Sequence, residues 1–311
     1  MQAVAKQRET DKADCGSGPA ESACAGCRQS ARHSLGYKGD YEFVCCEACG
    51  TISTRAPASG TVSSRQIYDQ FYEGATFQTP QIATASLNRL ADSFERFRRT
   101  GRWLDIGYGE GSLLSIAESK GWSCYGTELA THALDYGKRR GWTVSANAEV
   151  DPRFHRAAFD VVTMVEFLEH VHESDLFLRA AADWLRPGGL LYLTTPNALS
   201  FNRRLLGLDW SIFTPPEHVI IWTRDGLKSA FERNGFQALQ MRTEGLNPCE
   251  IKARFAGSGQ SNAPINRQDA AVRLNEAMSS SPLRRAIKRT LNQCLSSLRI
   301  GDTIKAWAIR K

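Results

Sequence analysis

The sequence predicts an α/β protein with a doubly wound, mostly parallel sheet, and three observations support this fold class. Short apolar runs alternate with amphipathic helical segments between residues 81 and 245. A glycine follows nearly every expected helix, at the position where a left-handed residue commonly ends a helix. A glycine-rich turn also joins the first expected strand to the next helix. We therefore expect a binding site at the carboxyl ends of the strands.

The individual elements follow from the spacing of apolar residues. A first helix is expected before residue 101, where four apolar residues recur at helical spacing: Leu87, Leu90, Phe94 and Phe97. The strands that follow are expected at 102–106, 123–128, 143–146, 159–165, 190–195 and 236–243. The helices among them are expected at 112–120, 130–140, 174–186 and 224–234. Thr223 is the expected N-cap of the last helix, and Gly235 lies just beyond its end.

The composition of the 311 residues indicates four parts. We expect a disordered leader at 1–20, a cysteine-rich module at 21–55, a linker at 56–80, and a large domain at 81–311 with a helical insertion at about 250–300. The first residues carry charges of both signs, unlike the apolar core of a secretory signal. No run approaches the roughly 18 apolar residues that span a bilayer, so the expected location is the cytoplasm.

The net charge of +6 is unevenly distributed along the chain. From Glu250 to the end there are 12 Lys or Arg and 4 Asp or Glu, which gives +8 and leaves −2 for the rest. The segment "SPLRRAIKRTLNQCLSSLRI" in this part is amphipathic. It is either a helix packed on the domain with a solvated charged face, or a surface helix. In the second case, residues 282–299 would contact an anionic membrane, a lipid-linked substrate or RNA.

Nine cysteines, six of them within the first 49 residues, indicate a metal site in a reducing compartment more than disulfide bonds. Cys24 and Cys27 form one C-x-x-C pair, and Cys46 and Cys49 form another. Two such pairs are typical of a tetrahedral zinc ribbon, because each places two thiolates on one tight turn. The ion would stabilise a module too small for its own core; a metal-free cluster is the alternative. The residues left over are Cys15, Cys45 and His33, the last a substitute ligand.

The turn "WLDIGYGEGS" indicates which ligand to expect at the strand ends. Gly107, Gly109 and Gly111 have the spacing G-x-G-x-G, whereas the dinucleotide fingerprint G-x-G-x-x-G places its third glycine one residue later. This spacing disfavours a nicotinamide-dependent dehydrogenase. Asp105 before the turn would repel a pyrophosphate but suits a cation, and Glu128 at the end of the next strand suits the hydroxyls of a ribose. The alternative is a sharp turn without a ligand.

Together these features resemble the class I S-adenosylmethionine (SAM)-dependent methyltransferases. The segments "LDIGYGEGS", "FDVVTMVEFLEHV" and "LRPGGLLYLTTPN" are similar to successive motifs of that family, and the resemblance covers about residue 71 to the C-terminus. It implies a Rossmann-like sheet of seven strands whose last strand, here 302–311, is antiparallel. It also implies a set of SAM-binding residues: Asp105, Gly107, Tyr108, Gly109, Gly111, Glu128, Asn147 and Val165.

Within that set, the resemblance implies that the glycine turn packs against the methionine part of SAM. Glu128 would hold the ribose, and Asn147 would contact the adenine. Tyr108 departs from the family pattern, which has a small residue or cysteine there, so its ring either narrows or covers the cofactor pocket or packs elsewhere. Three aromatic residues of the linker resemble a segment that folds over SAM, the alternative being packing on the sheet edge: Tyr68, Phe71 and Tyr72.

The segment "EFLEH" follows strand 159–165, at the edge where ligands bind. Glu166, Glu169 and His170 resemble a trio that coordinates a metal in ubiquinone-pathway O-methyltransferases, where the metal binds catechol oxygens. Carboxylates and an imidazole hold a divalent cation or supply an acid and a base. Related methyltransferases carry the same residues without a metal, as supports of the turn, so both interpretations stay open. We expect His172 to be incidental.

A second group of candidate residues, in "FTPPEHV", lies on the long connection after strand 190–195. Two prolines predict an extended entry into it. Histidine is the residue type most often used for proton transfer near neutral pH, which makes His218 a candidate base, and Glu217 beside it would orient or tune the imidazole. The pair resembles an acid–histidine pair in the active site of sugar C-methyltransferases; a buried histidine bonded to a backbone carbonyl is the alternative. The acceptor pocket is further expected to include Asn197, Arg203, Arg204 and Trp210.

The sequence therefore predicts methyl transfer from SAM to a small acceptor, either a sugar or glycoconjugate precursor or a quinone-like phenol, on oxygen or carbon. Glu217 and His218 are the first acid–base candidates, and Glu166 with His170 is the second set. One alternative is an RNA methyltransferase, although the cysteine module lacks a dense basic stripe with interleaved aromatics. Another alternative is a non-catalytic protein that keeps the fold to bind a partner.

Overall fold

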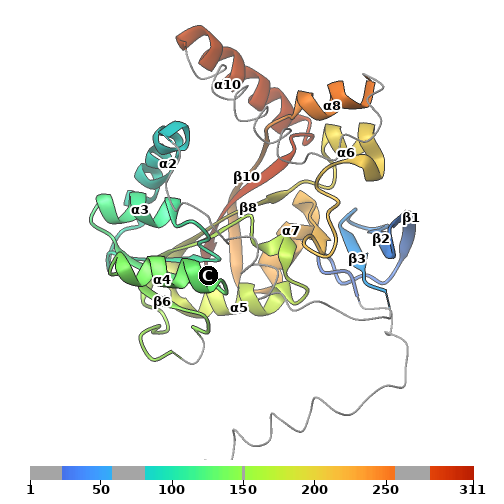
Figure 1. The fold of residues 1–311 in the computed structure, drawn as a ribbon. Helices are drawn as coiled ribbons and strands as arrows, with labels where there is room; N and C mark the ends of the chain where they lie inside the picture. The colour runs from blue at the N-terminus through green and yellow to red at the C-terminus, as the bar shows by residue number, and fades with distance from the viewer. Residues whose placement is uncertain (1–22, 58–80, 149–150, 256–280) are drawn as a thin grey trace, which may run out of the picture.

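The computed structural model describes residues 23–57, 81–148, 151–255 and 281–311, which form two sheets and the helices around them (Figure 1). The leader expected at 1–20 lies outside the described residues. So do three aromatic residues of the expected linker, Tyr68, Phe71 and Tyr72.

The larger sheet has seven strands in the order β10-β11-β8-β7-β4-β5-β6. In chain order the strands are β4 (Arg102–Ile106), β5 (Ser123–Thr127), β6 (Thr143–Ser145), β7 (Phe159–Val165), β8 (Leu185–Pro196), β10 (Phe236–Glu244) and β11 (Thr303–Arg310). Strands β4 to β8 pair in parallel, whereas β11 is antiparallel to both of its neighbours, β8 and β10. The predicted α/β class and the antiparallel last strand are therefore confirmed.

Helices pack on both faces of this sheet. The α-helices among the described residues are α2 (Gln81–Phe94), α3 (Ser112–Ser119), α4 (Thr131–Arg139), α5 (Ser174–Trp184), α6 (Phe201–Leu206), α7 (Arg224–Arg233), α8 (Pro248–Phe255) and α10 (Pro282–Ser297), of which α2 to α5 and α7 pack on the sheet faces. One hydrophobic core joins α5 and α7 to the sheet through residues such as Leu178 and Phe231. A second core, on the other face, joins α2, α3 and α4 to the sheet around Trp103 and Tyr192.

The expected elements agree with the observed ones to within a few residues, except at the start of β8. The helix expected at 174–186 ends at Trp184, and Leu185 already pairs with Phe159 of β7. The strand thus begins before the proline–glycine turn instead of after it, because Leu185 is buried in the sheet core. Thr223 caps α7 as expected.

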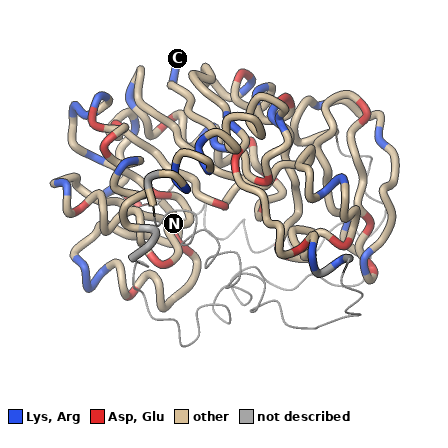
Figure 2. The backbone as a smooth tube through the Cα atoms, turned by 90° about the horizontal axis from the view of Figure 1, so that it is seen from above, with Lys and Arg blue, Asp and Glu red and all other residues tan. Residues whose placement is uncertain are grey.

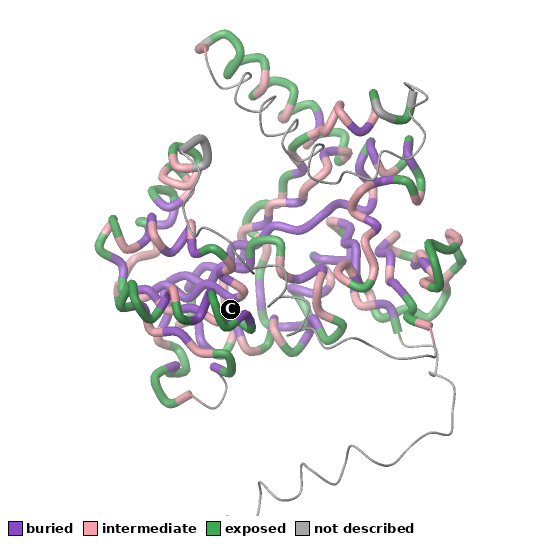
Figure 3. Tube along the Cα trace, viewed as in Figure 1, coloured by how far each residue is buried: buried purple, intermediate pink, exposed green. Residues whose placement is uncertain are grey.

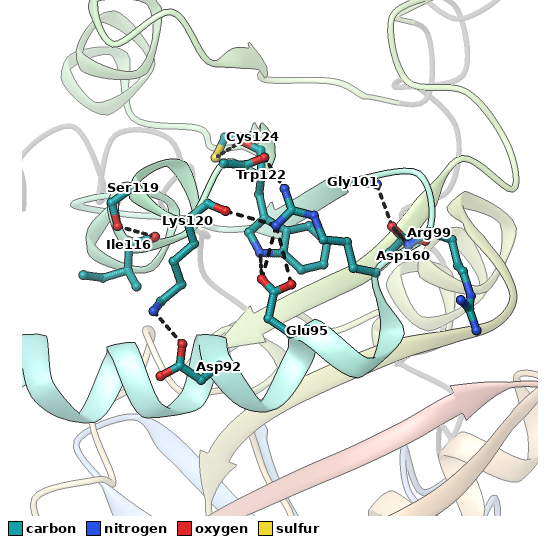
Figure 4. Close-up of polar contacts among 12 residues, drawn as sticks. Asp92, Glu95, Arg99, Gly101, Ile116, Ser119, Lys120, Trp122, Cys124 and Asp160 are labelled. Atoms are coloured by element: carbon teal, nitrogen blue, oxygen red, sulfur yellow. Dashed lines mark hydrogen bonds and ion pairs between the residues drawn. The ribbon is translucent and has the colours of Figure 1, made fainter.

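A polar network holds the C-terminal end of α2 against the turn between α3 and β5 (Figure 4). The Glu95 carboxylate accepts a hydrogen bond from Trp122 Nε1 at 3.0 Å, and Lys120 Nζ lies 2.6 Å from Asp92 Oδ1. Arg98 donates to the Lys120 carbonyl, and its guanidinium lies over the Trp122 ring. These contacts fix the helix that borders the ligand cavity at the strand ends.

The smaller sheet contains the cysteine-rich segment and has the strand order β1-β2-β3-β9. Its strands are β1 (Arg32–Lys38), β2 (Tyr41–Cys46), β3 (Ile52–Arg55) and β9 (Ile220–Ile221), all paired antiparallel. Strand β9 comes from the connection after β8, far along the chain. A third hydrophobic core packs Phe43 and Ile52 with Phe213 and Ile221. The cysteine-rich segment is therefore joined to the α/β part by a strand pairing and by a shared core.

Candidate active site

The glycine-rich turn between β4 and α3 forms one wall of a cavity at the carboxyl ends of the strands. Gly107, Gly109 and Gly111 have φ values of +68°, +53° and +71°, in the left-handed region that favours glycine. A Cβ atom at Gly107 would also lie 2.4 Å from the Phe167 ring. The glycines let the backbone turn sharply while Gly107 and Gly109 line the cavity.

Glu128 follows β5 and connects this turn to α4. Its Oε2 accepts a hydrogen bond from the Gly109 N–H at 2.9 Å, and its Oε1 accepts from the N–H groups of Leu129 at 2.7 Å and Ala130 at 3.2 Å. The residue is buried, yet it lines the cavity. A carboxylate oriented by these donors has further lone pairs for the hydroxyl groups of a ligand.

Asp105, near the end of β4, is a second buried acid on the same wall. Thr163 Oγ1 donates a hydrogen bond to Asp105 Oδ1 at 2.5 Å. Burial, with a smaller contribution from the charge of Glu128, raises the pKa of Asp105 to about 7. A cation in the cavity would favour the ionised form of this carboxyl.

Tyr108, whose role the sequence left open, has its ring packed inside the protein. The hydroxyl donates to the Ala133 carbonyl of α4 at 2.7 Å, and the ring meets Trp142 edge-on. Two glycines make the space: an added Cβ at Gly126 would lie 2.4 Å from the ring, and one at Gly137 would lie 2.8 Å from the hydroxyl oxygen. Tyr108 therefore joins the glycine turn to α4, although it still borders the cavity.

The cavity has a volume of about 1400 Å³ and extends from the glycine turn to the connection after β8. Asn147 and Val165 also line it, just after β6 and at the end of β7. Among the described residues its wall contains three histidines and no lysine or arginine. The carboxylates on the wall are Asp105, Glu110, Glu128, Glu166, Glu173, Glu217 and Glu250. Such a wall favours neutral or cationic ligands over anions.

The residues after β7 differ in burial. Glu166 is exposed at the cavity rim and has φ of +48°, which is rare for a residue with a side chain. Glu169 is fully buried: its Oε2 accepts from Thr195 Oγ1 at 3.0 Å, whereas its Oε1 has no hydrogen-bond partner among the described residues. Burial, followed by the charge of Glu166, raises the pKa of Glu169.

His170 and His218 face each other, with ring centroids 4.8 Å apart. Each ring is held through Nδ1 by a backbone carbonyl, that of Glu217 at 3.0 Å for His170 and that of Ile212 at 2.6 Å for His218. Because a carbonyl only accepts, Nδ1 of His218 donates in the neutral ring, and its Nε2 keeps a lone pair. Ligand atoms of Glu169, His170 and His218 lie within 4.8 Å of one another.

The observed contacts differ in two ways from the expected arrangement of these residues. The imidazole of His218 is oriented by the Ile212 carbonyl, and Glu217 contributes its backbone carbonyl to His170 instead of a carboxylate to His218. The cluster of potential ligand atoms contains Glu169, His170 and His218, whereas Glu166, also expected as a ligand, is exposed. Burial, with the neighbouring His218, lowers the pKa of His170 to about 4, so His170 is neutral near pH 7.

The far side of the cavity contains residues that sequence reasoning missed: Ser211, Ile212, Thr214, Asn247 and Glu250. The Glu250 carboxylate accepts from Ser211 Oγ at 2.8 Å and from Asn247 Nδ2 at 2.9 Å, which attaches the start of α8 to the connection after β8. Closeness to the "PPEH" motif is a signal for Ser211 and Thr214. No spacing pattern indicates Asn247 or Glu250, because they meet the cavity only through the tertiary fold.

The four further residues expected in the acceptor pocket do not line the cavity that the described residues form: Asn197, Arg203, Arg204 and Trp210. Asn197 is buried and donates to the carbonyls of Arg299 and Gly301. Trp210 is buried in the third core, edge-on to Phe213. His172, expected to be incidental, lines the cavity.

Four cysteine side chains converge beside the smaller sheet. The Sγ atoms of Cys24, Cys27, Cys46 and Cys49 lie within 4.8 Å of one another, with Cys24 3.6 Å from Cys49 and Cys27 3.5 Å from Cys46. A tetrahedron with zinc–sulfur bonds of about 2.3 Å has edges of roughly 3.8 Å, so the thiols fit a zinc ion. Cys45 lies outside the cluster, with its Sγ toward the Gly50 carbonyl, and Cys15 lies outside the described residues.

Comparison with known proteins gives matches in sequence and in fold. Residues 77–241 match the family described as a methyltransferase domain. A ubiquinone biosynthesis O-methyltransferase from Paracidovorax citrulli is 31% identical over 179 residues, which cover 52% of this chain and 73% of that protein. One from Idiomarina loihiensis is 32% identical over 134 residues, which cover 40% of this chain and 51% of that protein. A SAM-dependent methyltransferase from Archaeoglobus fulgidus shares the fold, with a TM-score of 0.50 and 17% identity over 80% of this chain and 100% of that one.

Proposed function

Because the chain belongs to the class I SAM-dependent methyltransferases, we propose that it methylates a hydroxyl group of a small, uncharged acceptor. The cavity is the observation that supports this, since it joins the glycine turn to His218 and has an acidic wall without lysine or arginine among the described residues. Neutral phenols and sugars suit such a wall better than anions do. The name that the similar proteins share, ubiquinone biosynthesis O-methyltransferase, favours a quinone-like phenol over a sugar and oxygen over carbon.

SAM would supply a methyl group on a sulfonium, which is already a strong electrophile. We assign its cationic amino group to Asp105 and its ribose hydroxyls to Glu128, because both are buried carboxylates on the cavity wall without an ion-pair partner among the described residues. Asn147 and Val165 would border the adenine. The glycine turn would place its backbone against the cofactor, and the remaining task of the protein would be to hold the acceptor oxygen in line with the methyl group.

His218 is the proposed general base. Its Nδ1 is engaged by the Ile212 carbonyl, which leaves Nε2 to take a proton from an acceptor hydroxyl in the cavity. His170, with a pKa lowered to about 4, stays neutral and does not repel a proton on its neighbour. Glu217 and Glu166 lie on the same wall and would interact with acceptor hydroxyls.

A second candidate mechanism uses a divalent cation held by Glu169, His170 and His218. The buried Glu169 Oε1, which has no hydrogen-bond partner among the described residues, supports it, as do the ligand atoms of the three side chains, which lie within 4.8 Å of one another. Two imidazoles and one carboxylate suit zinc, manganese or iron, and a cation there would stabilise the deprotonated acceptor oxygen. Titration of the protein with Mn²⁺ or Zn²⁺ tests this: we expect one site outside the cysteine module that Glu169→Gln removes. Titration of the wild type without such a site would exclude the cation.

A structural zinc ion is proposed for Cys24, Cys27, Cys46 and Cys49. The four convergent thiols support it, since an apolar core of this module alone is small and is shared with the α/β part. We expect one bound zinc per chain, lost in Cys46→Ser. An unchanged zinc content in that variant would exclude the four-cysteine site.

Helix α10 supports a peripheral contact with an anionic membrane. Most of this helix is exposed (Figure 3). Its apolar residues Leu283, Ile287 and Leu291 are 71%, 51% and 44% exposed, whereas Leu295 is buried. The helix has four basic residues and no acidic one. Apolar side chains flanked by positive charge suit an anionic lipid surface. No helix among the described residues is long and apolar enough to span a bilayer.

Vesicle sedimentation tests this contact. We expect binding to vesicles with phosphatidylglycerol that is lost when Leu283 and Ile287 become serine. Vesicle binding by the wild type that is as weak as that of the serine variant would exclude the membrane contact.

An RNA acceptor is less well supported. The cavity wall would repel phosphates, and lysine and arginine are interspersed with aspartate and glutamate over the backbone instead of forming one basic face (Figure 2). A non-catalytic, partner-binding protein would bind SAM without turnover.

The decisive experiment incubates the protein with SAM labelled in the methyl group and a panel of neutral acceptors, such as catechols and methyl hexosides. We expect label in at least one neutral hydroxyl compound and none in RNA or in phosphorylated sugars. Label in RNA alone, or SAM binding without transfer to cell-extract fractions, would overturn the proposal.

A further inference from the structure

The cysteine module lies directly behind the segment that holds His218. Thr54 on β3 makes two hydrogen bonds there: its Oγ1 donates to the His218 carbonyl at 2.9 Å, and its N–H donates to the Val219 carbonyl at 2.8 Å. The pairing continues as Ile52 of β3 lies opposite Ile221 of β9. The main chain at His218 is thus an extension of the smaller sheet.

Further contacts attach both ends of the same connection to the module. At the N-terminal end, Lys38 Nζ donates to the Phe213 carbonyl at 2.8 Å, and the Phe43 and Phe213 rings pack edge-on with centroids 4.7 Å apart. At the C-terminal end, Thr223 Oγ1 donates to the Cys49 carbonyl at 2.7 Å. The connection from residue 213 to residue 223 therefore has little freedom to move independently of the module.

The cysteine cluster in turn fixes the strand that carries Thr54. The Cys46 N–H donates to the Thr51 carbonyl at 2.9 Å, and the Gly50 N–H donates to the Cys46 carbonyl at 2.8 Å, which closes the turn between β2 and β3. Cys49 Sγ lies 3.2 Å from Thr51 Oγ1. The second pair of thiols thus sits in the turn from which β3 starts.

We propose that the cysteine module positions His218. Thr54 is the residue through which the ordered module fixes the main chain at His218. Two contacts constrain the imidazole. The Ile212 carbonyl accepts from Nδ1 and fixes the orientation of the ring, and Thr54 fixes the position of the main chain from which the ring projects. Loss of either would leave Nε2 misplaced relative to an acceptor oxygen. This inference rests on the proposed role of His218 as the base.

The first test compares variants on one strand. Thr54→Val keeps the shape of the side chain and removes its donor, and we expect kcat to fall about fivefold, the equivalent of one buried hydrogen bond. We expect the Kd of SAM to stay within about twofold. Thr54→Ser restores the donor and should restore kcat. Arg55→Ala is the matched control, since Arg55 faces solvent and pairs only with Glu42 of the module among the described residues. An unchanged kcat in Thr54→Val would overturn the proposal.

The second test needs no acceptor and uses hydrogen–deuterium exchange. Removal of zinc with a chelator, or Cys46→Ser, should raise exchange in the peptide 212–223 as well as in 24–55, while 102–112 stays protected. Increased exchange confined to 24–55 would overturn the coupling. If the wild type transfers no methyl group to any acceptor, the proposed function fails, and the exchange experiment still decides whether the module orders the His218 segment.

Discussion

The two halves of the cavity are built in different ways. The half that we propose to bind SAM, from Asp105 to Asn147 and called the SAM half below, comes from one continuous stretch of chain in which consecutive strands end side by side. The half that we propose to bind the acceptor, called the acceptor half below, combines the "EFLEH" turn, the "PPEH" connection and the start of α8, and the cysteine module contacts it through Thr54. The first half depends on local geometry and the second on long-range contacts. Substitutions in the SAM half should therefore change affinity for SAM, and those in the acceptor half should change the rate.

The largest effect is expected for His218→Gln, which removes the proposed base. A general base contributes roughly 100-fold or more, so kcat should fall by about that factor while the Kd of SAM is unchanged. His172→Gln is the matched control, because that histidine also lines the cavity and lies outside the cluster of potential ligands. Activity of His218→Gln within threefold of the wild type would exclude His218 as the general base.

Glu128→Ala should instead weaken the binding of SAM. Hydrogen bonds between hydroxyls and a carboxylate contribute roughly 1.5–3 kcal/mol, so the Kd of SAM should rise about 10- to 100-fold in titration calorimetry. Glu128→Gln keeps the size of the side chain and separates the loss of charge from the loss of packing. Affinity unaffected by Glu128→Ala would show that the ribose is held elsewhere.

Asp105, in the SAM half, should make the stability of the folded protein depend on pH. Its pKa of about 7 lies above the roughly 3.9 of an unfolded chain, so the folded protein binds the extra proton and its free energy of unfolding should fall as pH rises from about 4 to 7. Across that whole window the loss is on the order of 4 kcal/mol, and Asp105→Asn should remove it. Denaturation at a series of pH values measures this.

SAM binding should shift the same titration. A cationic amino group favours the ionised carboxyl, so binding near pH 6 should release a proton, visible as a buffer-dependent heat in calorimetry. Heat that is the same in all buffers would contradict the assignment of Asp105 to the amino group.

The smallest effect is expected for Tyr108→Phe. The variant loses the hydrogen bond to the Ala133 carbonyl and should lower the free energy of unfolding by about 1 kcal/mol, with the Kd of SAM unchanged. Thermal denaturation and calorimetry on the same sample separate the two. A higher Kd of SAM without a loss of stability would instead indicate that Tyr108 contacts SAM.

The sequence allowed prediction where the determinants are local. Strand 159–165 is observed with the expected bounds, because seven largely apolar residues between turns have few alternatives to a buried strand. The role of Tyr108 did not follow, since it depends on the absence of side chains at Gly126 and Gly137 on other elements. Nor did the support of His218 by Thr54, which joins residues 164 positions apart. Periodicity and motif spacing contain no information on such pairs.

The pairing of β3 with β9 also constrains how this chain can be divided. A shortened chain that starts after residue 57 would expose the buried Ile220 and Ile221 along an open strand edge, together with Phe213 from the shared core. Open apolar edges recruit other chains. Such a truncation should be recovered as aggregate or as a domain-swapped species, so we expect the N-terminal module and the α/β part to fold as one unit.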